Sequence, residues 1–313
     1  MAEPRHFLSL SDLPAGGIES LLRRAEEFRL LKRLRTPHAT RAGRVLGTIF
    51  EKASTRTRAS FEIAMFDLGG HALCLDIHAS QLGRGEPIRD TARVLSGYCD
   101  AIMIRTFGQD RAAELARFSR VPVINGLTDE SHPCQLLADL QTVAQRFQAT
   151  GQDVGDALRS VKYAWIGDGN NMANSWIEAA GILGLDLALA CPPGYLPNEK
   201  YVEAARATQR GQITFSATPA DAARGRHVLS TDVFTSMGQE SETQARKQAF
   251  AGFCIDAPLL ALADPAAIVL HCLPAHRGEE ISEEVLEGPA CLAWQEAENR
   301  LHAQKALIES VLT

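Results

Sequence analysis

The stretch VLGTIFEKASTRTRASFEIAMFDLGGHALCL (residues 45–75) decides the fold class. It opens with a short β-rich run at 45–50 and ends with a second one at 72–75. Between them, apolar side chains recur at helical spacing until Gly69 and Gly70 stop the pattern: Phe61, Ala64, Met65 and Leu68. A strand, a helix and a strand in this order predict a βαβ unit, whose two strands are parallel neighbours in one sheet.

The same alternation continues along the chain on both sides of a polar stretch at 148–156. An amphipathic helix is predicted at 18–34, and the final stretch, 292–312, is helical in pattern. Further short strands are predicted at 101–104, 121–124, 161–166, 185–190, 213–215, 228–229 and 268–270. We therefore expect two tandem α/β domains, each with a parallel sheet flanked by helices. The predicted division gives residues 1–147 to the first domain and 148–291 to the second.

Length and composition agree with this plan and exclude several classes of protein. A chain of 313 residues is about twice the usual domain length. A formal charge of -6 argues against a broad nucleic-acid surface, and no apolar run reaches the roughly 18 residues of a membrane helix. The seven cysteines form no C-x-x-C pair, and the N-terminus lacks a signal-peptide pattern. We expect a cytoplasmic protein without a disulfide framework or a zinc site.

The octapeptide EKASTRTR (51–58) follows the first predicted strand and leads directly into a helix. The start of a helix presents unpaired N–H groups and a positive dipole end, and here hydroxyl and guanidinium donors accompany it. This combination suits a phosphate group. The alternative is a Ser54 N-cap followed by surface arginines.

Other polar residues also follow predicted strands of the first half. Arg105 ends one strand and could bridge phosphate and carbonyl oxygens, while His132 opens a long helix and could stabilise an oxyanion. His132 could equally be a helix-start residue. Gln81 lies in a glycine-containing loop that could also be mobile surface.

In the second half, the sequence GDGNN (167–171) follows a strand but lacks the third glycine of a dinucleotide fingerprint. Its Asn170 and Asn171 could cap a helix or contact a substrate carboxylate. Asp232 ends another strand, where it could cap a turn or receive a cationic amine. Cys272 follows the last strand, where a single cysteine is usually inert packing.

Six motifs together resemble those of the aspartate and ornithine carbamoyltransferase family, in its order and at its spacing from residue 50 to 305. They are EKASTRTRASFE (51–62), HPCQ (132–135), GDGNN (167–171), SMG (236–238), HCLP (271–274) and ENR (298–300). The family writes the second motif as HPxQ, so Cys134 stands at its variable position. SMG indicates ornithine as the acceptor, and the basic cluster that aspartate would need is missing.

The resemblance implies transfer of the carbamoyl group of carbamoyl phosphate to the δ-amine of L-ornithine, giving L-citrulline and phosphate. It implies no metal and no organic cofactor, and a homotrimer in which a neighbour donates the Gln81 loop. It also implies that the C-terminal helix, about 292–313, completes the first domain. The reaction would serve arginine biosynthesis or arginine breakdown, between which the sequence does not decide.

Carried over by motif, the residues expected to bind carbamoyl phosphate are Ser54, Thr55, Arg56, Thr57, Gln81, Arg105, His132, Gln135, Cys272, Leu273 and Arg300. Those expected to bind ornithine are Asn171, Asp232, Ser236 and Met237. Catalytic roles fall to Cys272, Arg105, His132 and Asp232. The resemblance gives Arg58 a structural or inter-subunit role.

Two groups of alternatives stay open. One is a carbamoyltransferase for another acceptor, namely N-acetylornithine, putrescine or aspartate. The other is a nucleotide-binding regulatory module, suggested by the tandem α/β pattern and the GDG turn. A purely structural protein would leave the strand-end Arg105 and His132 unexplained.

Overall fold

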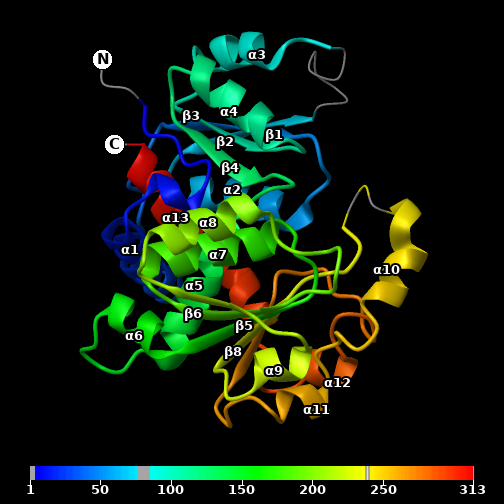
Figure 1. The fold of residues 1–313 in the computed structure, drawn as a ribbon. Coiled ribbons are helices and arrows are strands. Elements are labelled where there is room, and N and C mark those ends of the chain that lie inside the picture. The colour runs from blue at the N-terminus through cyan, green and yellow to red at the C-terminus, as the bar shows by residue number, and fades with distance from the viewer. Residues whose placement is uncertain (1–3, 77–84, 237, 239, 313) are drawn as a thin grey trace. The chain divides into compact units, whose positions relative to one another are not determined.

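The computed structural model describes residues 4–76, 85–236, 238 and 240–312 (Figure 1). The chain divides into two compact units. The first contains Met1–Gln141 together with Glu298–Thr313, and the second contains Thr142–Ala297.

The first unit is built on a four-stranded parallel sheet in the order β2-β1-β3-β4. Its strands are β1 (Val45–Phe50), β2 (His71–Asp76), β3 (Ala101–Arg105) and β4 (Val123–Leu127). Its helices are α1 (Ala15–Arg33), α2 (Thr55–Asp67), α3 (Ile88–Leu95), α4 (Gln109–Phe118) and the first part of α5 (Pro133–Phe147). One core cluster packs α3 and α4 on the sheet through Ile88, Leu95, Ile102, Ile104 and Leu115.

Strand pairing in this sheet brings the predicted phosphate segment beside Arg105. Phe50, the last residue of β1, is in register with Arg105 on one side and with Asp76 on the other. The chain leaving β1 therefore starts next to the end of β3. β4 begins and ends later than predicted, because Asn125 and Leu127 still pair with β3 despite the intervening glycine.

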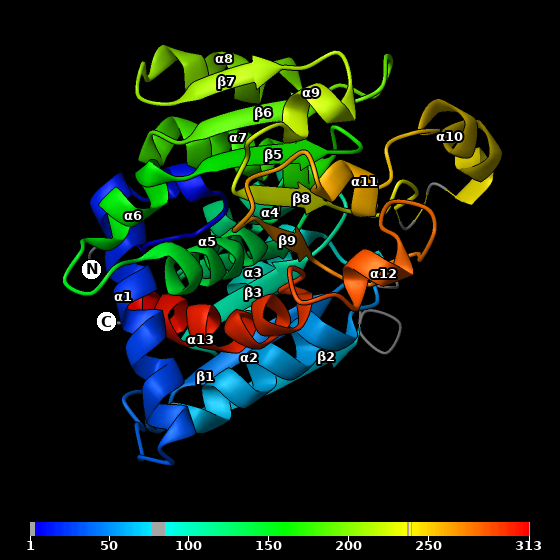
Figure 2. The ribbon, with the colours of Figure 1, turned by 90° about the horizontal axis from the view of Figure 1, so that it is seen from below.

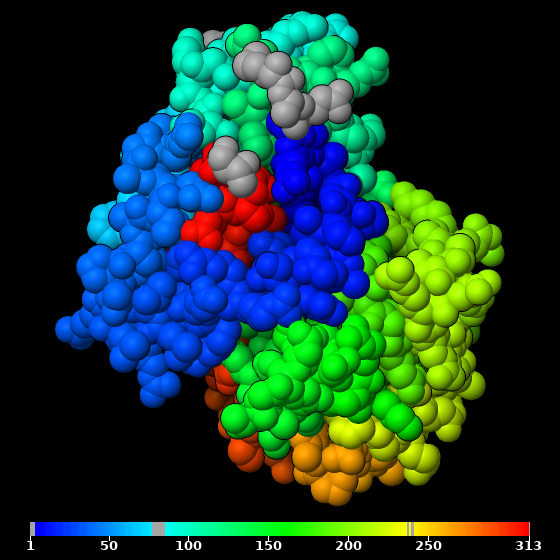
Figure 3. Space-filling view, turned by 90° about the vertical axis from the view of Figure 1, so that its left-hand side faces the viewer, coloured from blue at the N-terminus to red at the C-terminus, as the bar shows by residue number. Residues whose placement is uncertain are grey.

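The last helix, α13 (Ala293–Val311), belongs to the first unit from Glu298 onward. Its buried apolar residues include Ala303, Leu307 and Ile308, and Arg24 of α1 bonds Glu309 at 2.6 Å. Figure 3 shows its surface in red against the blue surface of the N-terminal segments. The predicted return of the C-terminal helix to the first domain is confirmed.

The second unit has a five-stranded parallel sheet in the order β7-β6-β5-β8-β9 (Figure 2). Its strands are β5 (Lys162–Ile166), β6 (Asp186–Ala190), β7 (Gln212–Phe215), β8 (Val228–Thr231) and β9 (Ile268–His271). The order makes β5, β8 and β9 neighbours, so the segments after them lie at one edge of the sheet. The predicted fold class, two tandem parallel α/β domains, is confirmed.

The predicted alternation of strands and helices extends to the longer helices of this unit, but its short helices were not predicted. α7 (Asn171–Leu183) and α8 (Glu199–Ala207) follow the expected pattern. The remaining helices are α6 (Val154–Ser160), α9 (Pro219–Ala223), α10 (Thr243–Ala249), α11 (Ala257–Leu260) and α12 (Glu283–Leu286). Segments of four to seven residues are too short to display a helical period. Among the described residues, no helix combines the length and the apolar character needed to cross a membrane.

Gly169, in the turn between β5 and α7, approaches neighbouring backbone too closely for a side chain. A Cβ there would lie 2.2 Å from the carbonyl carbon of Leu196 and 2.2 Å from Pro197 N. Backbone atoms cannot rotate away as a flexible side chain can, so Gly169→Ala should lower the free energy of unfolding by about 1–3 kcal/mol. Urea titration measures this. The control is Gly16→Ala on α1, where nothing lies within 4 Å of the new Cβ and stability should be kept or raised. Equal stability of both variants would contradict the close approach.

Candidate functional site

The start of α2 presents the predicted phosphate segment as a capped helix N-terminus. Ser54 is the N-cap, and its Oγ accepts a hydrogen bond from Thr57 N at 3.2 Å. Ser54, Thr55, Arg56 and Thr57 therefore form the cap and first turn of a 13-residue helix, with the positive end of its dipole at this place. Ser54 is thus an N-cap, as the alternative interpretation had it. The hydroxyl and guanidinium donors of the phosphate interpretation lie in the same turn.

Thr57 joins two arginines that are distant in the sequence. Arg105 Nη1 donates to Thr57 Oγ1 at 3.4 Å, and Arg300 Nη2 donates to the same oxygen at 3.3 Å. Arg300 Nη1 also donates to Gln135 Oε1 at 2.6 Å. Thr57, Gln135 and Arg300 are all buried. Four of the predicted residues, from α2, β3, α5 and α13, thus meet in the first unit.

His132 lies beside this cluster as a buried neutral imidazole. Burial lowers its pKa well below 6.5, and the positive charges of Arg300, Arg105 and Arg56 lower it further. The positive charges of three guanidinium groups thus all affect the one imidazole of His132. Concentrated positive charge at a helix N-terminus favours an anionic ligand, while the neutral imidazole can donate a hydrogen bond without adding charge.

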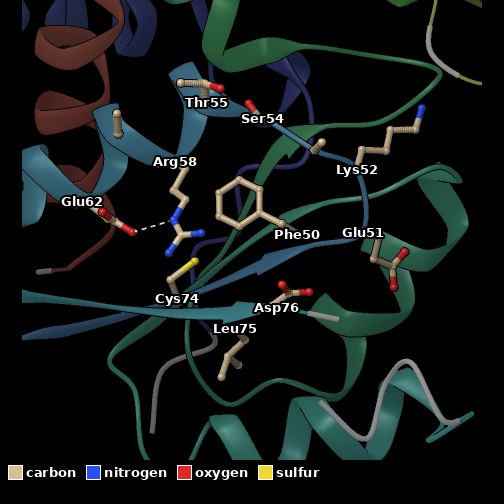
Figure 4. A pocket seen from close by; sticks show the side chains of 12 residues that line it. Phe50, Glu51, Lys52, Ser54, Thr55, Arg58, Glu62, Cys74, Leu75 and Asp76 are labelled. Atoms are coloured by element: carbon tan, nitrogen blue, oxygen red, sulfur yellow. Dashed lines mark hydrogen bonds and ion pairs between the residues drawn. The ribbon is translucent and has the colours of Figure 1, made fainter. Parts of the chain in front are cut away.

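An open pocket of about 520 Å³ borders the same helix start (Figure 4). Its lining includes Phe50 and Lys52 from the end of β1, Ser54 and Arg58 from α2, and Cys74 from β2. Arg58 points into this region and its Nε lies 3.0 Å from Glu62 Oε1. The inter-subunit role predicted for Arg58 stays a prediction.

In the second unit, Asp232 collects three donors at the end of β8. Its Oδ2 accepts from Asn170 Nδ2 at 2.9 Å, and its Oδ1 accepts from Cys272 Sγ at 3.1 Å and from Val233 N at 2.8 Å. Asn170 is itself fixed, because its side-chain oxygen caps α7 by accepting from Met172 N and Ala173 N. The structure therefore brings Asp232 and Cys272, two of the predicted site residues, into direct contact.

The segment after Cys272 is held by a buried histidine. Leu273 has a positive φ of 57°, unusual for a residue with a branched side chain, and its N–H donates to His271 Nδ1 at 2.9 Å. His271 Nδ1 is thus an acceptor, which assigns the ring proton to Nε2, 3.0 Å from Glu280 Oε1. This arrangement fixes the backbone on which Leu273 and Cys272 lie.

The other predicted residues have these positions. Asn171 is the first residue of α7, and Ser236 lies half-buried in the segment after β8. Gln81 and Met237 lie outside the described residues.

Within the described residues, two groups of side chains have the spacing of metal ligands, Asp232 with His271 and Cys272, and His276 with Glu279 and Glu280. In the first group both His271 ring nitrogens are engaged by Leu273 N and Glu280. In the second, Glu279 pairs with Lys247 at 2.8 Å. We assign no metal to either group.

Family models match almost the whole chain. The carbamoyl-phosphate-binding domain of the aspartate/ornithine carbamoyltransferases matches residues 5–145, and their aspartate/ornithine-binding domain matches residues 159–311. The chain belongs to the aspartate/ornithine carbamoyltransferase family.

Individual carbamoyltransferases are similar to this chain over its full length. An ornithine carbamoyltransferase of Pelobacter propionicus is 54% identical over 98% of both chains, and one of Halorhodospira halophila is 53% identical over 98% of this chain and 99% of its own. The solved ornithine carbamoyltransferase of Pyrococcus furiosus superposes with a TM-score of 0.90 at 44% identity, covering 98% of this chain and 96% of that one.

The sequence predicted Asn170 as a helix cap or carboxylate ligand, and it does cap α7, but its bond to Asp232 and the role of Arg246 were missed. Asn170 bonds Asp232, and the buried Arg246 of α10 bonds Asp168 of the GDG turn at 2.7 Å and the carbonyl oxygen of Phe234 at 2.9 Å. No local motif marks Arg246. The polar His271 inside the otherwise apolar run IVLH was the one available signal for the pair with Glu280.

The neutral state of His132 can be measured. Because the folded protein holds its pKa well below 6.5, the imidazole NMR signals of His132 should not move between about pH 8 and pH 5.5. Over this range the His132 imidazole gains a proton in the unfolded chain but not in the folded one. His132 should therefore lower the free energy of unfolding as the pH falls. His132→Gln identifies the signal by its loss. A titration of His132 centred near pH 6.5 would contradict this electrostatic environment.

Proposed function

We propose that this protein transfers the carbamoyl group of carbamoyl phosphate to the δ-amine of L-ornithine, giving L-citrulline and phosphate. The observation that carries the proposal is the meeting of Arg105 and Arg300 on Thr57 at the N-terminus of α2. A site with this charge suits a small phosphorylated substrate. Full-length similarity to proteins named ornithine carbamoyltransferase supports the choice of acceptor.

Carbamoyl phosphate is assigned to the first unit. Ser54, Thr55, Arg56 and Thr57 bind the phosphate, and Arg105 bridges phosphate and carbonyl oxygens. His132 and Gln135 bind the carbamoyl group, and Arg300 completes the set. We assign these roles to the predicted domain 1–147 with the helix at about 292–313.

Ornithine is assigned to the predicted domain 148–291. Asn171 would contact its carboxylate, and Asp232 would attract its δ-amine, together with the backbone of Ser236 and Met237. The acidic character of Asp232 suits a cationic side chain and opposes a dicarboxylic acceptor. Cys272 and the Leu273 carbonyl are assigned contacts to the amine and to the carbamoyl amide.

The chemical step is attack of the neutral δ-amine on the carbamoyl carbon. A C–N bond forms and the carbonyl becomes an oxyanion, which Arg105 and the neutral His132 stabilise. The C–O bond to phosphate then breaks, and the departing phosphate accepts the amine proton. An amine with a pKa near 10 is mostly protonated at neutral pH, so Asp232 and Cys272 are assigned the task of orienting its minor neutral form. No cofactor takes part in this proposed step.

The test is an assay of carbamoyl transfer with a panel of acceptors. Purified protein, carbamoyl phosphate and L-ornithine should form citrulline, and N-acetylornithine, putrescine and aspartate should react far more slowly. If one of these three compounds reacted faster than L-ornithine, that compound would be assigned as the acceptor in place of ornithine. Binding of NAD or ATP without binding of carbamoyl phosphate would instead support the nucleotide-binding alternative.

We further propose a homotrimer in which each neighbour donates its Gln81 loop. Large apolar side chains on the first unit support an interface there: Ile63 and Phe66 of α2 are 43% and 78% exposed, and Tyr98 after α3 is 72% exposed. Edge strand β2 adds Leu73 to these residues. Apolar surface of this kind marks contact sites in soluble proteins.

We place the reaction in the cytoplasm, in arginine biosynthesis or arginine breakdown. All seven cysteines are free thiols, which suits a reducing compartment.

Cys272→Ser tests the role of the thiol. A hydroxyl keeps part of the hydrogen bonding to Asp232, so the variant should retain measurable turnover with a raised ornithine KM and a shifted pH profile. Steady-state kinetics across pH measure both. Rapid quenching with labelled carbamoyl phosphate should trap no carbamoyl enzyme. A trapped thioester, or an unchanged KM and pH profile, would overturn the assignment.

Complementation tests the shared site. Gln81→Ala and Arg105→Ala should each be inactive, and mixed trimers refolded from both should regain activity. Some of their sites combine an intact Arg105 with a neighbour's intact Gln81. Mixed trimers confirmed by mass that stay inactive would refute donation between subunits.

A further inference from the structure

From Glu298 onward, α13 buries an unusual number of polar side chains in the first unit. Asn299, Arg300, His302, Gln304 and Lys305 are all between 0% and 3% exposed. Burying such groups is unfavourable unless each finds a partner, and for a charged amine the penalty is several kcal/mol. The partners of Lys305 are therefore informative about what holds this helix in place.

Lys305 is paired at the far end of α2. Its Nζ lies 3.1 Å from Asp67 Oδ2 and 3.1 Å from His38 Nε2. The other ring nitrogen of His38, Nδ1, lies 2.8 Å from the carbonyl oxygen of Thr36, which can only accept. A neutral His38 therefore offers Nε2 as an acceptor to the ammonium group. Lys32 of α1 also reaches Asp67, with its Nζ 2.8 Å from both carboxylate oxygens.

The pair is held in its charged form. Although burial alone would raise the pKa of the Asp67 carboxyl, hydrogen bonds from Lys32 and Lys305 outweigh burial and lower that pKa. Burial lowers the pKa of Lys305, and Asp67 opposes this shift. The Lys305 ammonium thus depends on Asp67 of α2, while the Asp67 carboxylate is held by Lys305 of α13 and by Lys32 of α1.

Three contacts connect α13 to α2 in the same order along both helices. Arg300 bonds Thr57, and Lys305 bonds Asp67. Between them, Gln304, with its amide oriented to satisfy both neighbours, donates to Ser60 Oγ at 2.7 Å and accepts from Arg300 Nη2 at 3.1 Å. Arg300 and Lys305 are about 7.5 Å apart along the helix axis. A shift of α13 by one turn, about 5.4 Å, would take Arg300 away from Thr57.

We propose that Lys305 and Asp67 are positioning residues whose buried ion pair fixes the register of α13 on α2 and so holds the Arg300 guanidinium at the carbamoyl-phosphate site. The proposal rests on the proposed function of that site. The ion pair supplies a penalty for every other register, since each would leave two buried charges apart.

The experiment compares Lys305→Met, Asp67→Leu and the double variant by calorimetry with carbamoyl phosphate. Asp67→Leu leaves the buried ammonium without its carboxylate and should weaken binding about 10- to 100-fold, the equivalent of about 1.5–3 kcal/mol for a hydrogen bond to a charged group. Lys305→Met should weaken binding less, because Asp67 keeps Lys32. The double variant buries no charge at this place and should fold as stably as wild type, but its affinity for carbamoyl phosphate should stay about 10-fold lower, because nothing then penalises other registers of α13.

A second ion pair of the same helix provides the control. Arg24 of α1 bonds Glu309, nine positions beyond Arg300. Glu309→Gln should lower the melting temperature without changing the affinity for carbamoyl phosphate. In the Lys305 and Asp67 variants the ornithine KM, measured at saturating carbamoyl phosphate, should change less than the carbamoyl-phosphate KM. A general loss of stability would not produce this split.

Single variants that fold and bind carbamoyl phosphate like wild type would overturn the proposal, as would a double variant that binds it like wild type. If a single variant does not fold, the double variant decides by the same comparison with wild type. Wild-type protein that binds carbamoyl phosphate but makes no citrulline would count against the proposed reaction alone, and the comparison of variants would stand. Wild-type protein that binds none would overturn both.

Discussion

The contact of the Arg300 guanidinium with Thr57 and Gln135 is the interaction on which the first unit depends. It joins the last helix of the chain to the first turn of α2 and to the start of α5. Because Arg105 reaches the same Thr57 hydroxyl from the end of β3, four elements converge at one point. The parallel sheet makes this possible, since it places the ends of β1 and β3 in register.

Electrostatics then determine what this point can bind. Burial lowers the pKa of His132, and the positive charges of Arg300, Arg105 and Arg56 lower it further, so the imidazole is neutral. Three like charges held together repel one another, and an anion of matching size relieves that repulsion. In the second unit the sign is reversed, because Asp232 is a buried carboxylate held by Asn170 and Cys272. The proposed function thus assigns an anion site to one unit and a cation site to the other.

Much of this arrangement could be predicted from the sequence. Strand and helix alternation around residues 45–75 was sufficient for the fold class. Arg105, Asp232 and Cys272 lie at or directly after the ends of strands, whereas His132 lies five residues beyond the end of β4, at the start of α5. The meeting of Arg300 with Thr57 followed only from family resemblance. Other partners that hold the sites, including Arg246 and Lys305, could not be predicted. Their roles depend on which helices pack together, and a lysine in a helical pattern looks the same whether it is exposed or buried.

If the anion site of the first unit is formed before ornithine binds, the two substrates should bind in a fixed order. Titration calorimetry of the intact protein, first with carbamoyl phosphate and then with ornithine, measures that order. Carbamoyl phosphate should bind the free protein at one site per chain, and ornithine should bind tightly only afterwards, because the first ligand prepares the site for the second. Tight ornithine binding to the free protein, unaffected by carbamoyl phosphate, would contradict it.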